Sequence, residues 1–224
     1  VDYIVAGGME SMTNAPYLLK KHRSGARLGH DTTYDHMFLD GLEDAYEEGR
    51  AMGSFAQATA DEYQLTREDM DGYAIESLTR ANAAIESGAF ADEVVPVTFK
   101  TRKGDVTVDT DEQPGKGRPD KIPQLRAAFA KDGTITAATS SSISDGAAAV
   151  VLTRESVAAE KGQTPVAKII GMAAHAREPK DFTVAPVGAI HKVLENTGWS
   201  LDDVDLWEVN EAFACVAMFA MRDI

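Results

Sequence analysis

The chain has 224 residues, a formal net charge of −14 at pH 7, 44% apolar residues and 26% charged residues. This apolar fraction can form a buried core, while the acidity argues against a phosphate-tracking nucleic-acid binder and a polybasic membrane anchor. No apolar run approaches the roughly 18 residues that span a bilayer. The single cysteine, Cys215, cannot form an internal disulfide or a multi-thiolate metal site, and it fits a reducing, cytoplasmic compartment.

The chain opens on a strand and a long polar loop. Val1–Ala6 is predicted to be a short buried strand, closed by Gly7 and Gly8. Residues 12–36 have loop composition, with a proline and several glycines. A loop of this length favours a functional role or an oligomer contact.

Three helices are predicted next, over residues 37–48, 54–63 and 66–87. The third has the strongest signal, because Thr66 and Asp69 form a capping-box pattern and Gly88 is placed to end the helix.

The second half is predicted to alternate strands and helices. Strands are expected at residues 94–99, 106–108, 134–138, 146–152, 166–174 and 204–209. Helices are expected at residues 155–161 and 186–196 and from the 210–214 segment to about 222, while residues 113–123 are expected to be irregular. Alternation of this kind favours an α/β sheet.

Three segments carry a functional signal. Residues 6–17 read AGGMESMTNAPY, residues 136–149 read TAATSSSISDGAAA and residues 210–214 read NEAFA. In this order and spacing they resemble the thiolases, the acyl-CoA C-acyltransferases. Met52-Gly53 and residues 125–129 add further matches, so the resemblance covers essentially the whole chain.

The resemblance implies an α/β thiolase fold, layered αβαβα, that is incomplete at both ends and carries an inserted α+β loop domain. Residues 1–13 would end the first portion of the N-terminal domain, and residues 14–142 would form the loop domain that covers CoA. Residues 143–163 would return to the N-terminal sheet. Residues 164–224 would begin the C-terminal domain.

The resemblance also implies an activity of the acetyl-CoA C-acetyltransferase type. Such an enzyme transfers acyl groups between CoA thioesters, by Claisen condensation or by thiolytic cleavage of 3-ketoacyl-CoA, in fatty acid metabolism. CoA thioesters are its substrates, and no metal or other cofactor, nucleic acid or membrane is implied. A cytoplasmic homodimer or homotetramer is expected, with residues 20–36 resembling the oligomerisation region.

One catalytic residue of the family matches a position here. Asn210 of the NEAFA segment would hold the water of an oxyanion hole. The family's nucleophilic cysteine lies upstream of the matching region, and its histidine and second cysteine lie downstream. The chain as given is therefore expected to be an internal fragment that is inactive alone.

Binding positions match more fully. Ser141 would contact the pantetheine of CoA, and Lys116 and Arg118 would offer basic groups to its nucleotide. The positions that would line the acyl and pantetheine channel are Leu42, Met52, Phe129, Ala137, Phe182, Ala212 and Phe213. Taken without the resemblance, the apolar members fit ordinary core packing, Ser141 fits a Ser/Thr turn and the two cations fit a solvated surface.

Departures from the family leave alternatives open. Ala51 stands where many acetoacetyl-CoA-type members have a histidine, which bears on chain-length preference. A non-catalytic thiolase-like acyl-CoA or lipid-binding protein would keep the pocket and dispense with the cysteines. A ketoacyl synthase shares the fold, but it uses a Cys-His-His set in place of NEAFA. Cys215, within an apolar helix, is predicted to be a buried structural thiol.

Overall fold

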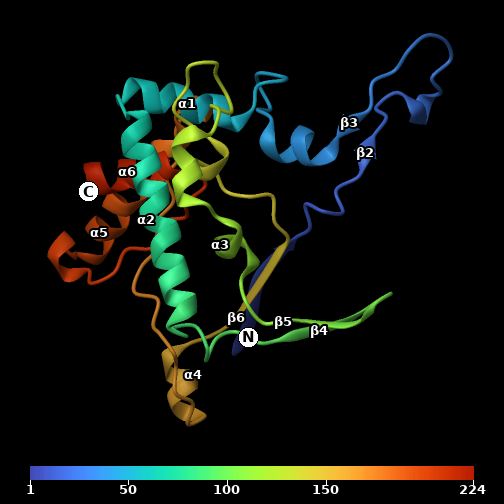
Figure 1. Cartoon of the computed structure of the whole chain (residues 1–224). Helices are drawn as coiled ribbons and strands as arrows, with labels where there is room; N and C mark the ends of the chain where they lie inside the picture. The colour runs from blue at the N-terminus through green and yellow to red at the C-terminus, as the bar shows by residue number, and fades with distance from the viewer.

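The longest helix, α2 (Arg67–Glu86), stands at the centre of the computed structural model, which describes residues 1–224 (Figure 1). Its start follows from the predicted capping box. The Asp69 amide donates to the Thr66 hydroxyl at 3.1 Å, and the Thr66 amide donates to the Asp69 carboxylate at 3.4 Å. At the other end Gly88 adopts a φ of +70°, so its amide can close on the Ile85 carbonyl at 3.1 Å. The predicted helix is confirmed with both of its ends.

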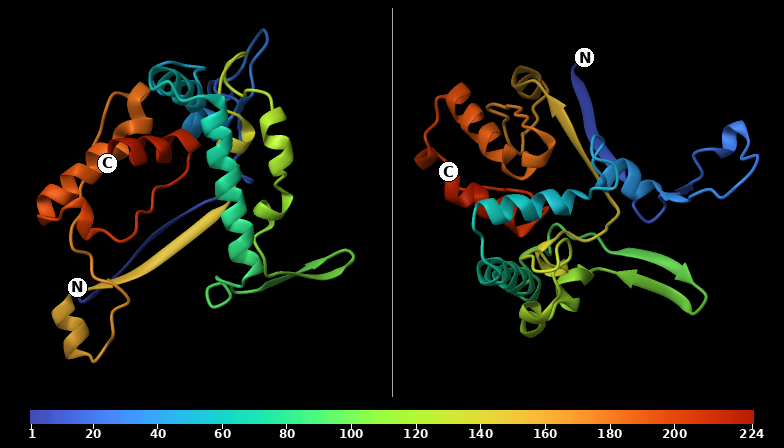
Figure 2. Two further views of the ribbon diagram at one scale, coloured as in Figure 1. Left: turned by 60° about the vertical axis from the view of Figure 1, so that its left-hand side comes forward. Right: turned by 90° about the horizontal axis from the view of Figure 1, so that it is seen from above.

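The other helices are α1 (Met52–Glu62), α3 (Glu112–Lys116), α4 (Glu155–Glu160), α5 (Ala185–Thr197) and α6 (Ala214–Asp223). Four of them lie near α2, while α4 lies apart from them (Figure 2). The helices expected around residues 54–63, 155–161, 186–196 and 214–222 are thereby confirmed. Gly198, in the left-handed region at φ +71°, ends α5 as expected. Among these helices, none combines the length and apolar composition that a bilayer crossing requires.

The core is helical and centres on α6. Its buried residues come from α1, α2, α6 and the short turns between them: Ala56, Ala60, Met70, Ile135, Val184, Ala214, Cys215, Val216 and Phe219. Tyr63, at the end of α1, packs its ring on Phe219 with the centroids 4.6 Å apart. This core fixes the beginning of α6, and therefore the residues just before it, against α1 and α2.

The strands form three separate antiparallel pairs. They are β1 (Tyr3–Glu10) with β6 (Gly146–Thr153), β2 (Tyr17–Leu18) with β3 (Tyr34–Asp35), and β4 (Val97–Thr101) with β5 (Gly104–Val108). The strands expected at the start of the chain, in the 94–108 hairpin and at residues 146–152 are confirmed, but the first strand does not close at Gly7 and Gly8: it runs through them to Glu10, because both glycines pair within the ladder with β6. The expectation that β1 is buried is wrong, and its partner β6 is exposed as well. Their apolar side chains are exposed, Val5 at 73% and Val151 at 70%, because the two-stranded ribbon has no layer packed on either face.

Two expected strands do not form. Residues 166–174 and 204–209 are largely apolar, but neither forms a strand or pairs with one. A strand is defined by the ladder it makes with a neighbour, and apolar composition does not supply that neighbour. Ile169 and Leu206 are accordingly exposed at 66% and 90%.

Three local expectations are also corrected. The helix expected over residues 37–48 ends at Leu42, because the Asp44 carboxylate accepts the amides of Tyr46 and Glu47 and turns the chain. The irregular stretch 113–123 contains α3 and the 3-10 turn Pro119–Gln124, since proline is tolerated in the first turn of a helix. The extended segment 134–138 gives way to the 3-10 turn Ala137–Thr139.

Replacing the cap of α2 should destabilise the whole chain, because α2 carries part of the core. Thr66→Ala is expected to lower the free energy of unfolding by about 1 kcal/mol, or about 2–4 °C in Tm. Thr79→Ala is the matched control, since Thr79 lies exposed in the middle of the same helix and its hydroxyl bonds only to the Ile75 carbonyl. Equal melting temperatures for the two variants would contradict the role of the cap.

Candidate functional site

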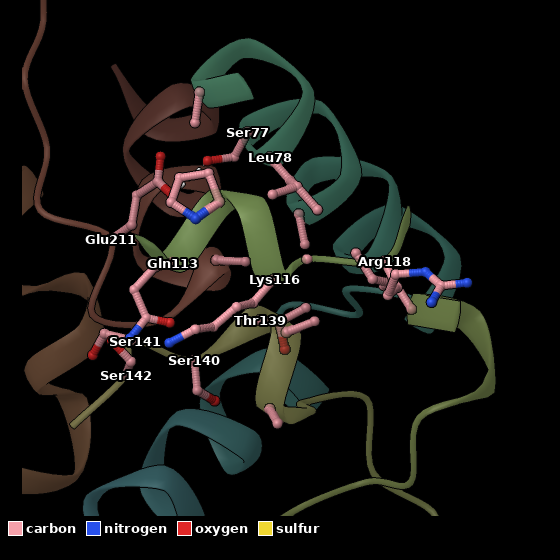
Figure 3. Close-up of a pocket in the computed structure, with 18 of the residues that line it drawn as sticks. Ser77, Leu78, Gln113, Lys116, Arg118, Thr139, Ser140, Ser141, Ser142 and Glu211 are labelled. Carbon is pink, nitrogen blue, oxygen red and sulfur yellow. Dashed lines mark hydrogen bonds between the residues drawn. The ribbon is translucent and has the colours of Figure 1, made fainter. Parts of the chain in front are cut away.

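A cavity of about 650 Å³ lies beside α2 (Figure 3). Its other walls are the 111–125 region with α3, residues 137–142, and Glu211 with Ala214 at the start of α6. Small-molecule sites commonly enclose roughly 300–1,000 Å³. The cavity therefore has the size of a ligand site, and four separate segments of the sequence build it.

The serine run forms one wall and is held to the residues before α6. The Ser141 amide donates to the Ala212 carbonyl at 3.0 Å, and Ser140 forms an antiparallel bridge with Phe213. On the other side the Ser140 hydroxyl donates to the Thr136 carbonyl at 2.8 Å. Of the predicted site residues, Ser141 and Ala137 line the cavity, and Ala212 lies directly behind Ser141.

Three cations line the cavity on the side of α3: Lys116, Arg118 and Lys121. The Lys116 ammonium pairs with Glu112 at 2.9 Å, which lowers the pKa of the Glu112 carboxyl. The Arg118 guanidinium lies 3.5 Å from the Asp120 carboxylate, and both side chains are exposed to solvent. Cations of this kind exchange partners readily, so an incoming phosphate can replace the surface carboxylates.

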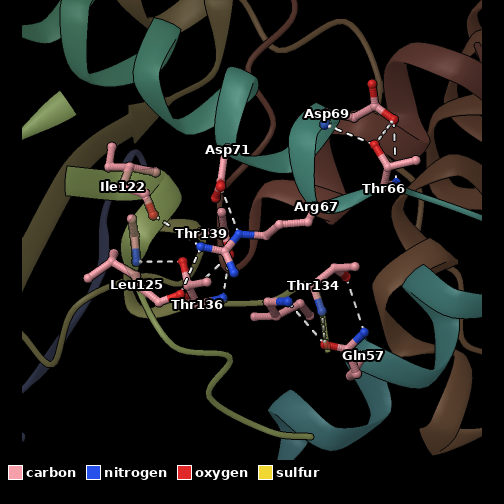
Figure 4. Close-up of polar contacts among 12 residues, drawn as sticks. Gln57, Thr66, Arg67, Asp69, Asp71, Ile122, Leu125, Thr134, Thr136 and Thr139 are labelled. Atoms are coloured by element: carbon pink, nitrogen blue, oxygen red, sulfur yellow. Dashed lines mark hydrogen bonds and ion pairs between the residues drawn. The ribbon is translucent and has the colours of Figure 1, made fainter. Parts of the chain in front are cut away.

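Arg67 of α2 ties this basic region to the body of the protein (Figure 4). Its guanidinium pairs with Asp71 at 2.7 Å and donates to the carbonyls of Ile122 and Leu125 at 3.1 and 2.9 Å. The Asp71 side chain is only 7% exposed. A guanidinium can serve three acceptors at once because its donors lie in a fixed fork. The position of the Pro119–Gln124 turn, and of the cations on it, depends on this contact.

A second group of predicted residues lies away from the cavity, around Phe129. The rings of Phe129 and Phe213 meet edge to face with centroids 6.0 Å apart. Gly53 lies against the Phe129 ring so closely that a Cβ there has no room, which brings the neighbouring Met52 to the same region. These aromatic residues pack on the helical core. They do not line the cavity itself.

Two further predicted residues, Leu42 and Phe182, also lie outside the cavity lining. Leu42, half-buried, ends the helical turn Phe38–Leu42, and Phe182, half-buried, lies in the turn Pro179–Val184 that packs on α1 and α6. Their assignment to an acyl channel stays a prediction.

Asn210 lies beside the cavity, one residue before the lining residue Glu211. Its carbonyl accepts the Ala212 amide at 3.0 Å, which makes a tight turn, and the residue is exposed. An exposed primary amide offers two donors and an acceptor to a water or a carbonyl. The role predicted for Asn210 is compatible with this placement, and it stays a prediction.

Sequence reasoning missed three residues of the cavity wall: Tyr73, Ser77 and Glu211. The Tyr73 hydroxyl donates to the Glu211 carboxylate at 2.7 Å and the Ser77 hydroxyl donates to it at 3.1 Å. Burial and the bond to Glu211 raise the pKa of Tyr73 above its ordinary value. The sequence does show two hydroxyl side chains four residues apart on α2, Tyr73 and Ser77. Their common partner, Glu211, lies in a distant segment that only the fold brings near.

Cys215 is fully buried in the core at the first turn of α6. Burial raises the pKa of its thiol to about 12, so the thiol stays neutral at physiological pH. The prediction of a buried structural thiol is confirmed. No three His, Cys, Asp or Glu side chains are grouped in a way that could hold a metal ion.

Comparison with known families defines the class of this protein. The thiolase N-terminal domain matches residues 1–156 and the thiolase C-terminal domain matches residues 163–224. The chain therefore belongs to the thiolase family. The finer divisions at residues 13, 142 and 163 stay predictions.

Its relatives are named as acetyl-CoA acetyltransferases. A probable acetyl-CoA acetyltransferase of Dictyostelium discoideum is 47% identical over 216 residues, which cover 96% of this chain and 52% of the relative. The acetyl-CoA acetyltransferase of Rhizobium meliloti is 46% identical over 222 residues, covering 99% of this chain and 56% of the relative. The chain thus spans about half the length of the curated relatives it matches, in agreement with the expected internal fragment.

Solved structures confirm the expected fold class. An acetyl-CoA acetyltransferase from Syntrophomonas wolfei superposes with a TM-score of 0.92 at 38% identity, covering 99% of this chain and 56% of that one. The human mitochondrial 3-ketoacyl-CoA thiolase superposes with a TM-score of 0.89 at 35% identity, with the same coverage. The chain has the thiolase fold over the part that it spans.

Removing the Arg67 guanidinium should release the basic turn from α2 and leave Asp71 without its cation. Arg67→Met is expected to lower the free energy of unfolding by about 2–3 kcal/mol. Arg80→Met is the matched control, because Arg80 makes the same kind of ion pair with Glu76 on the same helix but is 79% exposed. Its cost should stay under about 0.5 kcal/mol in urea unfolding curves. Similar costs for both variants would refute the tethering role of Arg67.

The raised pKa of Cys215 predicts an inert thiol in the native chain. Its alkylation by iodoacetamide at pH 9 should be about 100-fold slower than in urea or more, because burial limits access and leaves little thiolate. A solvated thiol of pKa 9.0 is about half ionised at pH 9, whereas a thiol with a pKa of about 12 is about 0.1% ionised there. Because the chain has one cysteine, mass spectrometry reads this site without ambiguity. Labelling of the native chain as fast as in urea would show that the thiol is accessible.

Proposed function

We propose that this chain is the CoA-binding portion of an acetyl-CoA acetyltransferase, an enzyme that transfers acyl groups between CoA thioesters. The observation that carries the proposal is the cavity. It joins a cluster of cations at one side to a serine wall and, beyond that wall, to the turn that contains Asn210. The names of the relatives support the choice of substrate.

The parts of a CoA thioester correspond to the parts of the cavity. Its phosphates would take Lys116, Arg118 and Lys121 as partners, because cations bind phosphate oxygens by charge-assisted hydrogen bonds. Its pantetheine would lie along residues 137–142, where small side chains let a ligand approach the backbone. The thioester end would then lie toward Asn210.

Asn210 would act on the carbonyl of the thioester. When a thiolate or a carbanion attacks that carbonyl, negative charge develops on its oxygen, and a donor fixed in advance lowers the barrier. The side-chain amide of Asn210 would supply that donor through a water. The attacking thiolate is not Cys215, because a buried thiol with a pKa of about 12 stays protonated. We propose for the same reason that these 224 residues alone do not turn over substrate.

Further parts of the proposal concern the setting of the enzyme. The residues from 14 to 36 extend from the body as an arm, with Leu28 fully exposed, which supports assembly into a homodimer or homotetramer (Figure 1). We also propose that the enzyme is located in the cytoplasm and acts in fatty acid metabolism. The proposed reaction needs no resident metal or redox cofactor, since the CoA thioester itself activates the carbonyl carbon.

Calorimetry with CoA tests the proposed site. The chain should bind CoA, and Lys116→Ala should weaken binding about tenfold, as expected for one charged hydrogen bond. Lys103→Ala, in the exposed turn between β4 and β5, is the matched control and should leave the affinity unchanged. Pantetheine lacks the nucleotide, so its binding should not respond to Lys116→Ala. Absence of CoA binding, or equal losses at both lysines, would overturn the assignment.

A further inference from the structure

Glu211 is held by α2, although it belongs to the segment that precedes α6. Its two carboxylate oxygens accept from two hydroxyls, Oε1 from Tyr73 at 2.7 Å and Oε2 from Ser77 at 3.1 Å. Figure 3 shows Ser77 and Glu211 close together at the cavity wall. The two donors are four residues apart and share one face of the helix. A carboxylate with both oxygens bonded to one rigid helix has a fixed position and a fixed orientation.

The chain before Glu211 is less well supported. Residues 204–209 pair with no strand and Leu206 is 90% exposed, although Val209 packs partly buried against the core. The chain after Glu211 is fixed by the Ser141–Ala212 hydrogen bond and by the core. Asn210 therefore lies between Val209, which packs on the core, and Glu211, whose hydrogen bonds join this turn directly to α2.

The chemistry of the contact suits a permanent anchor. An ionised carboxylate only accepts hydrogen bonds, so each of its oxygens can pair with one hydroxyl donor and no donor proton of its own is left without an acceptor. Hydrogen bonds to an ionised acceptor are about twice as strong as neutral ones. Tyr73 stays protonated at neutral pH, because burial and then Glu211 raise the pKa of its phenol, and it therefore remains a donor.

We propose that Glu211 is a positioning residue for Asn210, anchored by Tyr73 and Ser77 of α2. Glu211 does not take part in the reaction. It fixes the 210–212 turn against the cavity wall, so that the Asn210 amide keeps one position relative to a ligand that lies along residues 137–142. The inference rests on the proposed function only in taking Asn210 as the residue that faces the thioester.

Hydrogen exchange in the 224-residue chain, without ligand, tests the anchor directly. The amides of Ala212 and Ser141 report on the turn, and the amide of Ala60 in α1 reports on the core. Glu211→Ala should accelerate exchange at Ala212 and Ser141 about tenfold, the factor that corresponds to one charge-assisted hydrogen bond, and leave Ala60 unchanged. Glu208→Ala is the matched control, because Glu208 is an exposed carboxylate of the same segment. Equal effects from the two variants, or no effect, would overturn the proposal.

Variants of α2 separate the hydroxyls from packing. Tyr73→Phe keeps the ring and loses the hydroxyl, so it should reproduce part of the acceleration. Ser77→Ala should do the same, while Ser77→Thr keeps a hydroxyl and should restore slow exchange. Because all of these act through one carboxylate, Tyr73→Phe should add nothing to Glu211→Ala in the double variant. Additive effects, or equal exchange in Ser77→Ala and Ser77→Thr, would contradict the anchor.

The side-chain amide of Asn210 gives a readout that a purely structural role would not change. With the anchor intact and CoA bound, its two NH₂ protons should have resolved NMR shifts that differ from those of the free chain. In Glu211→Ala, the difference in Asn210 NH₂ shifts between the CoA-bound and the free chain should shrink. Lys116→Ala should still weaken CoA binding in that background. If the wild-type chain binds no CoA, the proposed function fails, and the exchange experiment still decides the anchor. If CoA binds and the Asn210 signals are the same in both chains, the positioning role fails and the proposed function stands.

Discussion

The burial of α6 against α1 and α2 is the interaction on which the candidate site depends. Ala214, Cys215 and Phe219 are almost completely removed from water in the largest buried cluster of the chain. Burial of apolar area at about 25 cal/mol per Å² is the main favourable term in folding, and it is concentrated here. The outer ribbons contribute little to that term, because their strands are open to solvent on both faces.

Because α6 is fixed, the residues before it are fixed as well. Phe213 and Ala212 then present backbone groups to Ser140 and Ser141, and the serine run becomes a wall of the cavity. The opposite wall is set by Arg67, which holds the basic turn on the same helix that faces the serines. The site is thus a consequence of two independent attachments to α2, one through apolar packing and one through a guanidinium.

Local signals in the sequence were sufficient for the helices. The Thr66 box and Gly88 place both ends of α2, and Gly198 places the end of α5, because caps and left-handed glycines act within one turn of the chain. Local signals failed where a neighbour decides the outcome. Residues 166–174 have strand composition but no ladder, and the helix expected to reach Glu48 stops at Leu42 because the side chain of Asp44 competes for backbone amides.

The sequence by itself determined the family, through segments such as NEAFA and the serine run, and it determined the candidate ligand wall at Ser141 and Ala137. Those are properties of short runs, in which residue type and spacing are read along the chain. Only the tertiary structure decided that Tyr73 and Ser77 hold Glu211, and that Leu42 and Phe182 lie outside the cavity lining. A contact across 138 residues has no local signature, because it depends on how two helices pack and not on the spacing of the residues that meet.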